Sequence, residues 1–237
     1  MNMQHKTAII TGASKGIGKA VALGFGQIGY QTVLIGRNSD DLQAVSGKIS
    51  GDGGLKPAVF SLDITDSAGI AAAVQQIMEQ FGRIDVLVNN AGVHFGGSLS
   101  LPPEDFKAML ETNLTAQFVF AREVVPVMKE QQSGYIFNVA SRSGKVGFAG
   151  SGGYCASKFG LMGLSESLYR ELTPQGIKVT ALCPAWVNTR MAFKAGTPLE
   201  PEEMIQPGDL FETIRWLLNL SDGACVKEVV ITNPKSL

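Results

Sequence analysis

The sequence predicts one α/β domain with a parallel sheet and helices on both of its faces. Short apolar runs, typical of strands buried on both faces, alternate with longer segments of helical periodicity. Many of the 28 glycines of the 237-residue chain fall where such runs end, as the tight turns of an α/β sheet require. No linker-like stretch or charge block divides the chain, so we expect a single domain over residues 1–237.

The apolar runs and the helical segments follow one another along the whole chain. Strands are expected at residues 7–10, 32–35, 58–62, 84–88, 135–139, 177–182 and 226–231. Helices are expected at residues 19–28, 39–50, 67–81, 101–128, 154–173 and 206–220. This alternation predicts a doubly wound, seven-stranded parallel sheet. Residues 114–128 are apolar on two sides, so one stripe should cover the sheet and the other is a candidate oligomer contact.

The composition excludes several classes of partner. The chain has 20 basic and 21 acidic residues, and it shows neither a basic stripe for nucleic acid nor a polybasic tract for a membrane surface. No apolar run is long enough to span a bilayer, and the N-terminal residues lack the apolar region of a signal peptide. The three cysteines have no metal-ligand spacing. We therefore expect a cytoplasmic protein with reduced thiols and no metal.

A glycine-rich loop lies between the first strand and the first helix. Gly12, Gly16 and Gly18 fall in the stretch Thr-Gly-Ala-Ser-Lys-Gly-Ile-Gly. Glycines there allow the backbone to approach a pyrophosphate, and the helix that follows presents free N–H groups to it. The alternative is an ordinary glycine turn, which the position at the first strand-to-helix junction disfavours.

This spacing resembles the cofactor loop of the short-chain dehydrogenase/reductase family. Two further motifs match that family: Asn-Asn-Ala-Gly at residues 89–92, and Tyr-x-x-x-Lys at Tyr154 and Lys158. Ser141 precedes Tyr154 by 154 − 141 = 13 positions, which is the Ser-to-Tyr spacing of the family. The resemblance covers nearly the whole chain. It implies a Rossmann fold and reversible hydride transfer between a nicotinamide cofactor and a carbonyl or secondary alcohol.

The resemblance implies four catalytic residues: Asn113, Ser141, Tyr154 and Lys158. Tyr154 and Lys158 are four residues apart in a predicted helix and therefore share one face. A nearby ammonium is expected to lower the pKa of the Tyr154 phenol from its usual value of about 10. In the family, the serine positions the substrate carbonyl, and Ser143 is the alternative to Ser141 for this role. The asparagine of the family breaks its helix locally and holds a water that relays protons to the lysine. The sequence alone leaves open a solvent-facing Asn113.

Arg37 follows the second strand, where an NAD-dependent enzyme has a carboxylate for the ribose. Arg37 would attract a 2′-phosphate, and Lys15 in the glycine loop adds a second positive charge, so NADP is expected as the cofactor. The alternative is that both side chains are merely solvated. The resemblance places Asp63 against the adenine, although a helix cap or a turn is the alternative for this residue.

The resemblance assigns cofactor contacts to residues that follow five of the strands and to two residues of the helix at 154–173. They are Gly12, Ser14, Lys15, Gly16, Ile17, Gly18, Arg37, Asp63, Asn89, Ala91, Gly92, Tyr154, Lys158, Pro184, Val187 and Thr189. Asparagine amides in the Asn-Asn-Ala-Gly motif are also expected to tie neighbouring strand ends together. Ala185 stands where the family usually has glycine.

The substrate is the least defined part of the prediction. Residues 188–206 correspond to a substrate lid in the family, and His94 either contacts the substrate or is an exposed loop residue. We expect an activity like that of a 3-oxoacyl-(acyl-carrier-protein) reductase acting on a carbonyl or acyl-thioester substrate. Alternatives are a small ketone, a polyol or a sugar, or a non-catalytic NADP-sensing protein. Members of this family are usually homodimers or homotetramers, but the chain lacks the Asp-Gly-Gly ending common among tetrameric relatives.

Overall fold

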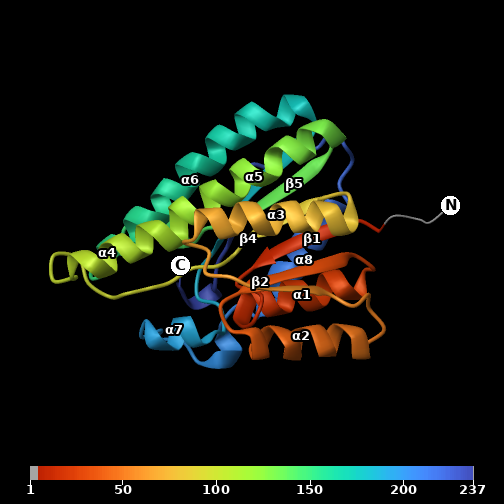
Figure 1. Ribbon diagram of the computed structural model, residues 1–237. Helices are drawn as coiled ribbons and strands as arrows, with labels where there is room; N and C mark the ends of the chain where they lie inside the picture. The colour runs from red at the N-terminus through yellow and green to blue at the C-terminus, as the bar shows by residue number, and fades with distance from the viewer. Residues whose placement is uncertain (1–4, 237) are drawn as a thin grey trace.

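The computed structural model describes residues 5–236 and places the predicted strands in one parallel sheet (Figure 1). The strands are β1 (Thr7–Thr11), β2 (Gln31–Gly36), β3 (Ala58–Ser61), β4 (Val86–Asn89), β5 (Gly134–Val139), β6 (Ile177–Pro184) and β7 (Glu228–Ile231). Their order across the sheet is β3-β2-β1-β4-β5-β6-β7. Every neighbouring pair is parallel. The predicted doubly wound, seven-stranded fold is confirmed.

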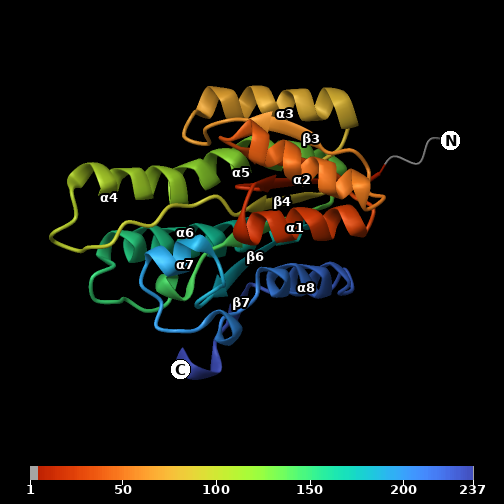
Figure 2. The same ribbon diagram turned by 90° about the horizontal axis from the view of Figure 1, so that it is seen from below.

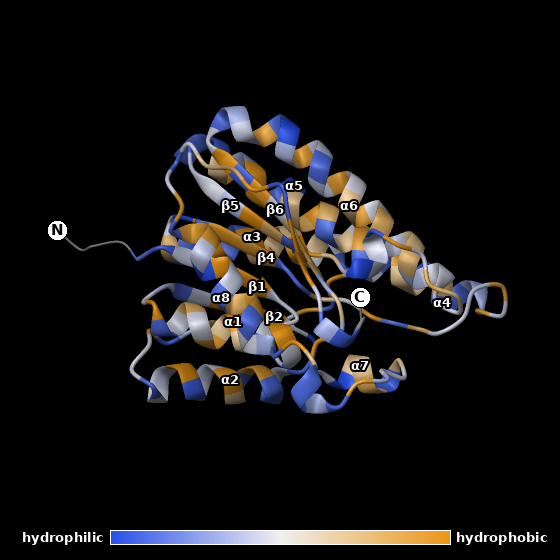
Figure 3. Ribbon diagram, turned by 180° about the vertical axis from the view of Figure 1, so that it is seen from behind, coloured by the Kyte–Doolittle hydropathy of each residue, from blue (hydrophilic) through white to orange (hydrophobic). Residues whose placement is uncertain are grey.

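Helices cover both faces of the sheet, as Figures 1 and 2 show. One face packs against α1 (Gly16–Gln27), α2 (Ser39–Gly51) and α8 (Pro207–Leu218). The other face packs against α3 (Ser67–Phe81), α5 (Ala116–Gln131) and the end of α6 (Gly152–Leu172). The five inner strands are therefore buried on both sides, which explains why they are continuous apolar runs rather than alternating ones. Figure 3 shows this contrast between hydrophobic strands and helices of mixed character.

The predicted helix at residues 101–128 is divided into three parts. It consists of α4 (Pro103–Leu110), one π-helical turn (Glu111–Thr115) and α5. The apolar stripes of α5 behave as expected: Phe120 is fully buried against the sheet, whereas the Phe118 side chain is 46% exposed. No helix within residues 5–236 is long and apolar enough to cross a membrane.

The order of the strands sets the position of the site. The connections after β1 lead toward β2 and β3, whereas β4 lies on the opposite side of β1. Neighbouring loops thus diverge at the carboxyl ends of β1 and β4, and in open α/β sheets ligands bind in the crevice formed there.

Candidate active site

A cavity of about 1360 Å³ opens at the carboxyl edge of the sheet. Its walls come from the loops after β1, β2, β3, β4, β5 and β6, together with the first turns of α6 and α7 (Arg190–Lys194). Pockets for drug-sized ligands usually measure roughly 300–1,000 Å³. The cavity is therefore large enough for an extended ligand and a second, smaller one.

The glycine loop forms one end of this cavity. Gly12 and Gly16 have φ angles of +64° and +52°, in the left-handed region that favours glycine. A Cβ on Gly18 would lie 2.2 Å from the Gly12 carbonyl oxygen, so only glycine fits where α1 packs against the loop. No side chain caps the N-terminus of α1 at Lys15, which leaves its first N–H groups free for an anion. This geometry fits the phosphates of a dinucleotide.

The Asn-Asn-Ala-Gly motif ties three strands together. The Asn89 amide donates to Asn138 Oδ1 of β5 at 2.9 Å, and the Asn90 amide donates to the Thr11 carbonyl of β1 at 2.9 Å. Asn89 is 1% exposed and does not line the cavity, whereas Asn90 does. The Asn89 side chain faces α5, where its amide donates to the Gln117 carbonyl, and the cofactor contact expected at this residue stays a prediction. Its role as a tie between strands is confirmed.

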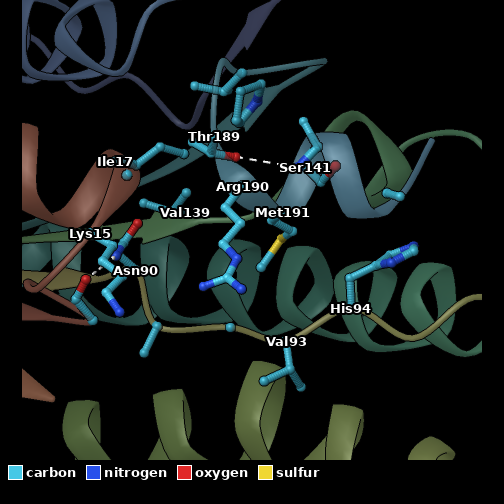
Figure 4. Close-up of a pocket in the computed structure, with 18 of the residues that line it drawn as sticks. Lys15, Ile17, Asn90, Val93, His94, Val139, Ser141, Thr189, Arg190 and Met191 are labelled. Atoms are coloured by element: carbon cyan, nitrogen blue, oxygen red, sulfur yellow. Dashed lines mark hydrogen bonds between the residues drawn. The ribbon is translucent and has the colours of Figure 1, made fainter. Parts of the chain in front are cut away.

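Ser141 and Tyr154 both line the cavity, and Figure 4 labels Ser141 in its wall. Ser141 follows the end of β5, and Tyr154 lies in the first turn of α6. Burial raises the pKa of Tyr154 to about 12, and a hydrogen bond with the Ser141 side chain opposes this rise. The His94 ring packs edge-on against the Tyr154 ring, with 4.9 Å between the centroids, and burial lowers the pKa of His94. At neutral pH the group facing the cavity is thus a protonated phenol beside a hydroxyl and a neutral imidazole.

Lys158 lies one turn beyond Tyr154 on the same face of α6. Its Nζ is 5.7 Å from the centroid of the Tyr154 ring and donates to the Val139 carbonyl at 2.8 Å. The residue is 4% exposed, and burial lowers its pKa to about 8. The expected lowering of the Tyr154 pKa by this ammonium is wrong for this arrangement, because desolvation of the phenol is the dominant effect and raises that pKa.

Asn113 lies in the π-helical turn and is completely buried. Its side chain accepts from the Val93 N–H at 2.8 Å and donates to the Val93 carbonyl at 2.9 Å and to Ser157 Oγ at 3.0 Å. It does not line the cavity. Asn113 therefore positions the loop after β4 against α6, and its expected part in a proton relay to Lys158 stays a prediction.

The far end of the cavity contains the residues predicted for the adenosine side. Arg37 and Asp63 both line it. Hydrogen bonds from Thr65 hold the pKa of Asp63 below its usual value, and Arg37 contributes to this shift. Lys15 forms an ion pair with Asp41 at 2.8 Å. Two positive charges, on Arg37 and Lys15, thus line this end of the cavity, and Asp41 partly neutralises that of Lys15.

The loop after β6 forms the remaining wall. Pro184, Val187 and Thr189 line the cavity. The Thr189 hydroxyl accepts from the Ala192 N–H at 3.4 Å and so caps α7. A Cβ on Gly16 would lie 3.1 Å from Thr189 Cγ2. This loop therefore closes onto the glycine loop from the opposite side of the cavity.

All predicted site residues line this cavity except Gly18, Asn89 and Asn113, and Gly18 acts through its close packing. Sequence reasoning did not assign Asn90, Arg142, Trp186 or Arg190, which also line it. Each of the four is adjacent in sequence to an assigned residue, and this adjacency is the only feature of the sequence that could have indicated them. Among the described residues no group of three or more histidine, cysteine or acidic side chains could hold a metal ion.

A parallel sheet with a phosphate-accepting glycine loop and a Ser–Tyr–Lys cluster in one cavity defines a dinucleotide-binding oxidoreductase. The family model for short chain dehydrogenase matches residues 6–199. The chain therefore belongs to the short-chain dehydrogenase family.

Three similar proteins illustrate this membership. The crystal structure of a beta-ketoacyl-[ACP] reductase (FabG) from Bacteroides thetaiotaomicron is 48% identical, covers 98% of each chain and has a TM-score of 0.87. The 3-oxoacyl-[acyl-carrier-protein] reductase FabG of Escherichia coli (strain K12) is 35% identical over 192 residues, 81% of this chain and 77% of the relative. A metagenomic short-chain oxidoreductase crystallised in complex with NADP is 33% identical, covers 96% of each chain and has a TM-score of 0.84.

The buried Lys158 gives a prediction about stability. Its pKa falls from 10.5 to about 8 on folding, so the unfolded chain binds more protons between these values and the stability of the wild type should rise with pH there. The shift corresponds to about 3 kcal/mol at pH 7. Lys158→Met removes this penalty but leaves the Val139 carbonyl unpaired, which costs about 1–3 kcal/mol. We therefore expect the unfolding free energy of Lys158→Met to fall relative to that of the wild type as the pH rises from 7 to 10.

Urea unfolding at several pH values measures this difference. Lys178→Met is the matched control, because the Lys178 Nζ also donates to a backbone carbonyl, that of Ser221 at 2.9 Å, but from an exposed position. Its difference from wild type should not change with pH. A Lys158→Met difference that is constant from pH 7 to pH 10 would contradict the prediction.

Proposed function

We propose that this chain is an NADP(H)-dependent reductase that acts on the 3-oxo group of an acyl thioester, with an acyl-carrier-protein thioester as the favoured substrate. The observation that carries the proposal is the cluster of Ser141, Tyr154 and Lys158 in the cavity onto which the glycine loop opens. This arrangement brings a proton donor and a carbonyl-binding hydroxyl to the place where a nicotinamide ring would lie beside a substrate.

The roles of the residues follow from their positions. NADPH, when bound, supplies the hydride. Tyr154 keeps its proton at neutral pH because its pKa is about 12, so it can donate this proton to the carbonyl oxygen in the reductive direction. Ser141 Oγ orients that oxygen. Lys158 is held against the Val139 carbonyl and places a positive charge beside the phenol, which would stabilise the phenolate left after proton transfer.

The choice of NADP rests on the charges at the end of β2. Arg37 and Lys15 line the cavity there, and a 2′-phosphate would accept charge-assisted hydrogen bonds from them. The metagenomic relative crystallised with NADP supports the same choice. The ion pair between Lys15 and Asp41 makes Arg37 the main determinant of this preference.

The proposed substrate class is supported by the names of the relatives, two of which are 3-oxoacyl or beta-ketoacyl carrier-protein reductases. Residues 188–206 are proposed as the lid over the substrate within one domain that spans the chain. The two ends of this segment are joined by the Val187–Ile205 bridge, and Met191 and Pro198 within it line the cavity.

Assembly and location complete the proposal. We propose a homodimer or homotetramer, because α4, α5 and α6 expose three phenylalanines, Phe106, Phe118 and Phe159, each between 38% and 46% exposed. A cytoplasmic location agrees with three free cysteines, Cys155, Cys183 and Cys225.

A substrate panel tests the proposal. The purified protein is incubated with NADPH and, in turn, with an acetoacetyl thioester, simple ketones and a keto sugar, and the loss of NADPH absorbance at 340 nm is followed. We expect the highest kcat/KM for the thioester. Turnover confined to the keto sugar or to polyols would exclude the proposed substrate class, and no turnover with any carbonyl compound would exclude a reductase.

A further inference from the structure

Two arginine side chains line the substrate side of the cavity. Among the described residues that line the cavity, Asp41 and Asp63 are the acidic ones, and both lie at the adenosine end. Arg142 and Arg190 line the cavity together with Ser141, Tyr154 and His94. A cavity built in this way attracts an anion and repels a cation.

Arg190 is the more informative of the two arginines. It begins α7, within the proposed lid, and its side chain extends into the cavity beside Met191, between Asn90 and His94 (Figure 4). Within residues 5–236 the Arg190 guanidinium has no hydrogen bond or ion pair with another residue. Two other cationic side chains at the cavity do pair with carboxylates: Lys15 with Asp41, and Lys235 with Glu203. Arg190 therefore offers a planar set of donors that suits a carboxylate or a phosphate.

Arg142 adds charge from the opposite wall. It directly follows Ser141, and its guanidinium lies 5.1 Å from the centroid of the Phe148 ring. Phe148 also lines the cavity. This stacking on an aromatic face restricts the Arg142 side chain near the carbonyl-binding serine.

We propose that Arg190, with Arg142, binds an oxyanion of the substrate, so that the enzyme prefers carbonyl compounds bearing a carboxylate or a phosphate. The inference rests on the proposed function only in placing the reacting carbonyl at Ser141 and Tyr154. The oxyanion has two possible sources: a carboxylate of the substrate itself, or the phosphate of a phosphopantetheine arm. The affinity of the enzyme for each anionic compound is the quantity to measure, because a Kd can be determined whether or not turnover occurs.

Two matched pairs of probes separate these sources. Acetoacetate and ethyl acetoacetate differ in the free carboxylate, whereas acetoacetyl-4′-phosphopantetheine and acetoacetyl-pantetheine differ in the phosphate. Calorimetric titration of the protein saturated with NADP⁺ gives the Kd of each probe. We expect one charged probe to bind about ten-fold or more tightly than its neutral partner, and the pair that shows this preference identifies the source.

Substitutions of Arg190 test whether this residue causes the preference for the charged probe. Arg190→Gln should remove most of it, and Arg190→Lys should retain part of it, because a lysine keeps the charge but loses the planar fork. Lys194→Gln, on the same short helix but outside the cavity lining, should bind both pairs as the wild type does. The Kd of NADPH, measured by its fluorescence, should change less than about three-fold in all three variants.

Two results would overturn the inference. The first is a wild-type protein that binds neither charged probe more tightly than its neutral partner, including one that binds none of the four. The second is an Arg190→Gln variant that loses NADPH affinity and keeps the preference between probes, which would place this guanidinium on the cofactor pyrophosphate. If no compound of the substrate panel were turned over but a charged probe still bound more tightly than its neutral partner, only the proposed reaction would be contradicted.

Discussion

Tyr154→Phe is expected to reduce kcat about 10²–10⁴-fold while leaving the affinity for NADPH nearly unchanged. The substitution removes one hydroxyl, which is the proposed proton donor and the hydrogen-bond partner of Ser141. The phenylalanine ring keeps the edge-on contact with His94, at 4.9 Å between centroids in the wild type, so the wall of the cavity should be preserved. Steady-state kinetics with the best substrate of the panel and a fluorescence titration with NADPH measure the two effects separately.

Tyr169→Phe is the matched control for this prediction. Tyr169 lies in the same helix, α6, and packs partly buried against the core far from the cavity lining. It should retain both turnover and NADPH binding. Near-normal turnover in Tyr154→Phe would show that another group protonates the carbonyl, whereas equal loss of turnover and NADPH affinity would indicate a structural defect.

Arg37→Asp is expected to lower the ratio of kcat/KM for NADPH to that for NADH by about 10–100-fold. A hydrogen bond to a charged group contributes about 1.5–3 kcal/mol, and the new carboxylate would also repel a 2′-phosphate while accepting hydrogen bonds from a ribose. Lys15 cannot fully compensate because it is paired with Asp41. The loss should appear mainly in the KM for NADPH, since Arg37 lies far from the reacting atoms.

Arg170→Asp makes the same change in charge on the exposed side of α6, where Arg170 pairs with Glu166. The cofactor ratio of this control should equal that of the wild type. If Arg37→Asp left the relative KM values for the two cofactors unchanged, then the 2′-phosphate would not be recognised at the end of β2.

Most of the fold was predictable because both faces of the sheet are covered. Strands buried on two sides are short apolar runs, so their positions are visible in the sequence without knowledge of their partners. The glycine loop was equally visible, since Gly12 and Gly16 adopt positive φ and Gly18 has no room for a side chain. Both constraints act on residues close together in the chain, so the sequence pattern alone reveals them.

Features that depend on three-dimensional surroundings were not predictable in the same way. Which of Asn89 and Asn90 faces the cavity depends on how β4 ends, and a shift of one residue exchanges the two faces. Helical periodicity continues across residues 101–128, so it did not reveal the π turn that orients Asn113. The pKa of Tyr154 depends on its burial, which neither spacing nor residue type records.

The attachment of residues 188–204 to the sheet has a consequence for how such proteins diversify. The Trp186 carbonyl accepts from the Ile205 N–H at 3.0 Å, and the Asn188 N–H donates to the Ile205 carbonyl at 2.8 Å. The Asn233 amide, 1% exposed, also donates to the Trp186 and Glu203 carbonyls. Because both ends of the loop are fastened at one place, its interior can change in length and composition without disturbing any strand. Under the proposed function this segment covers the substrate, so replacing it would change substrate preference and leave Ser141, Tyr154 and Lys158 in place.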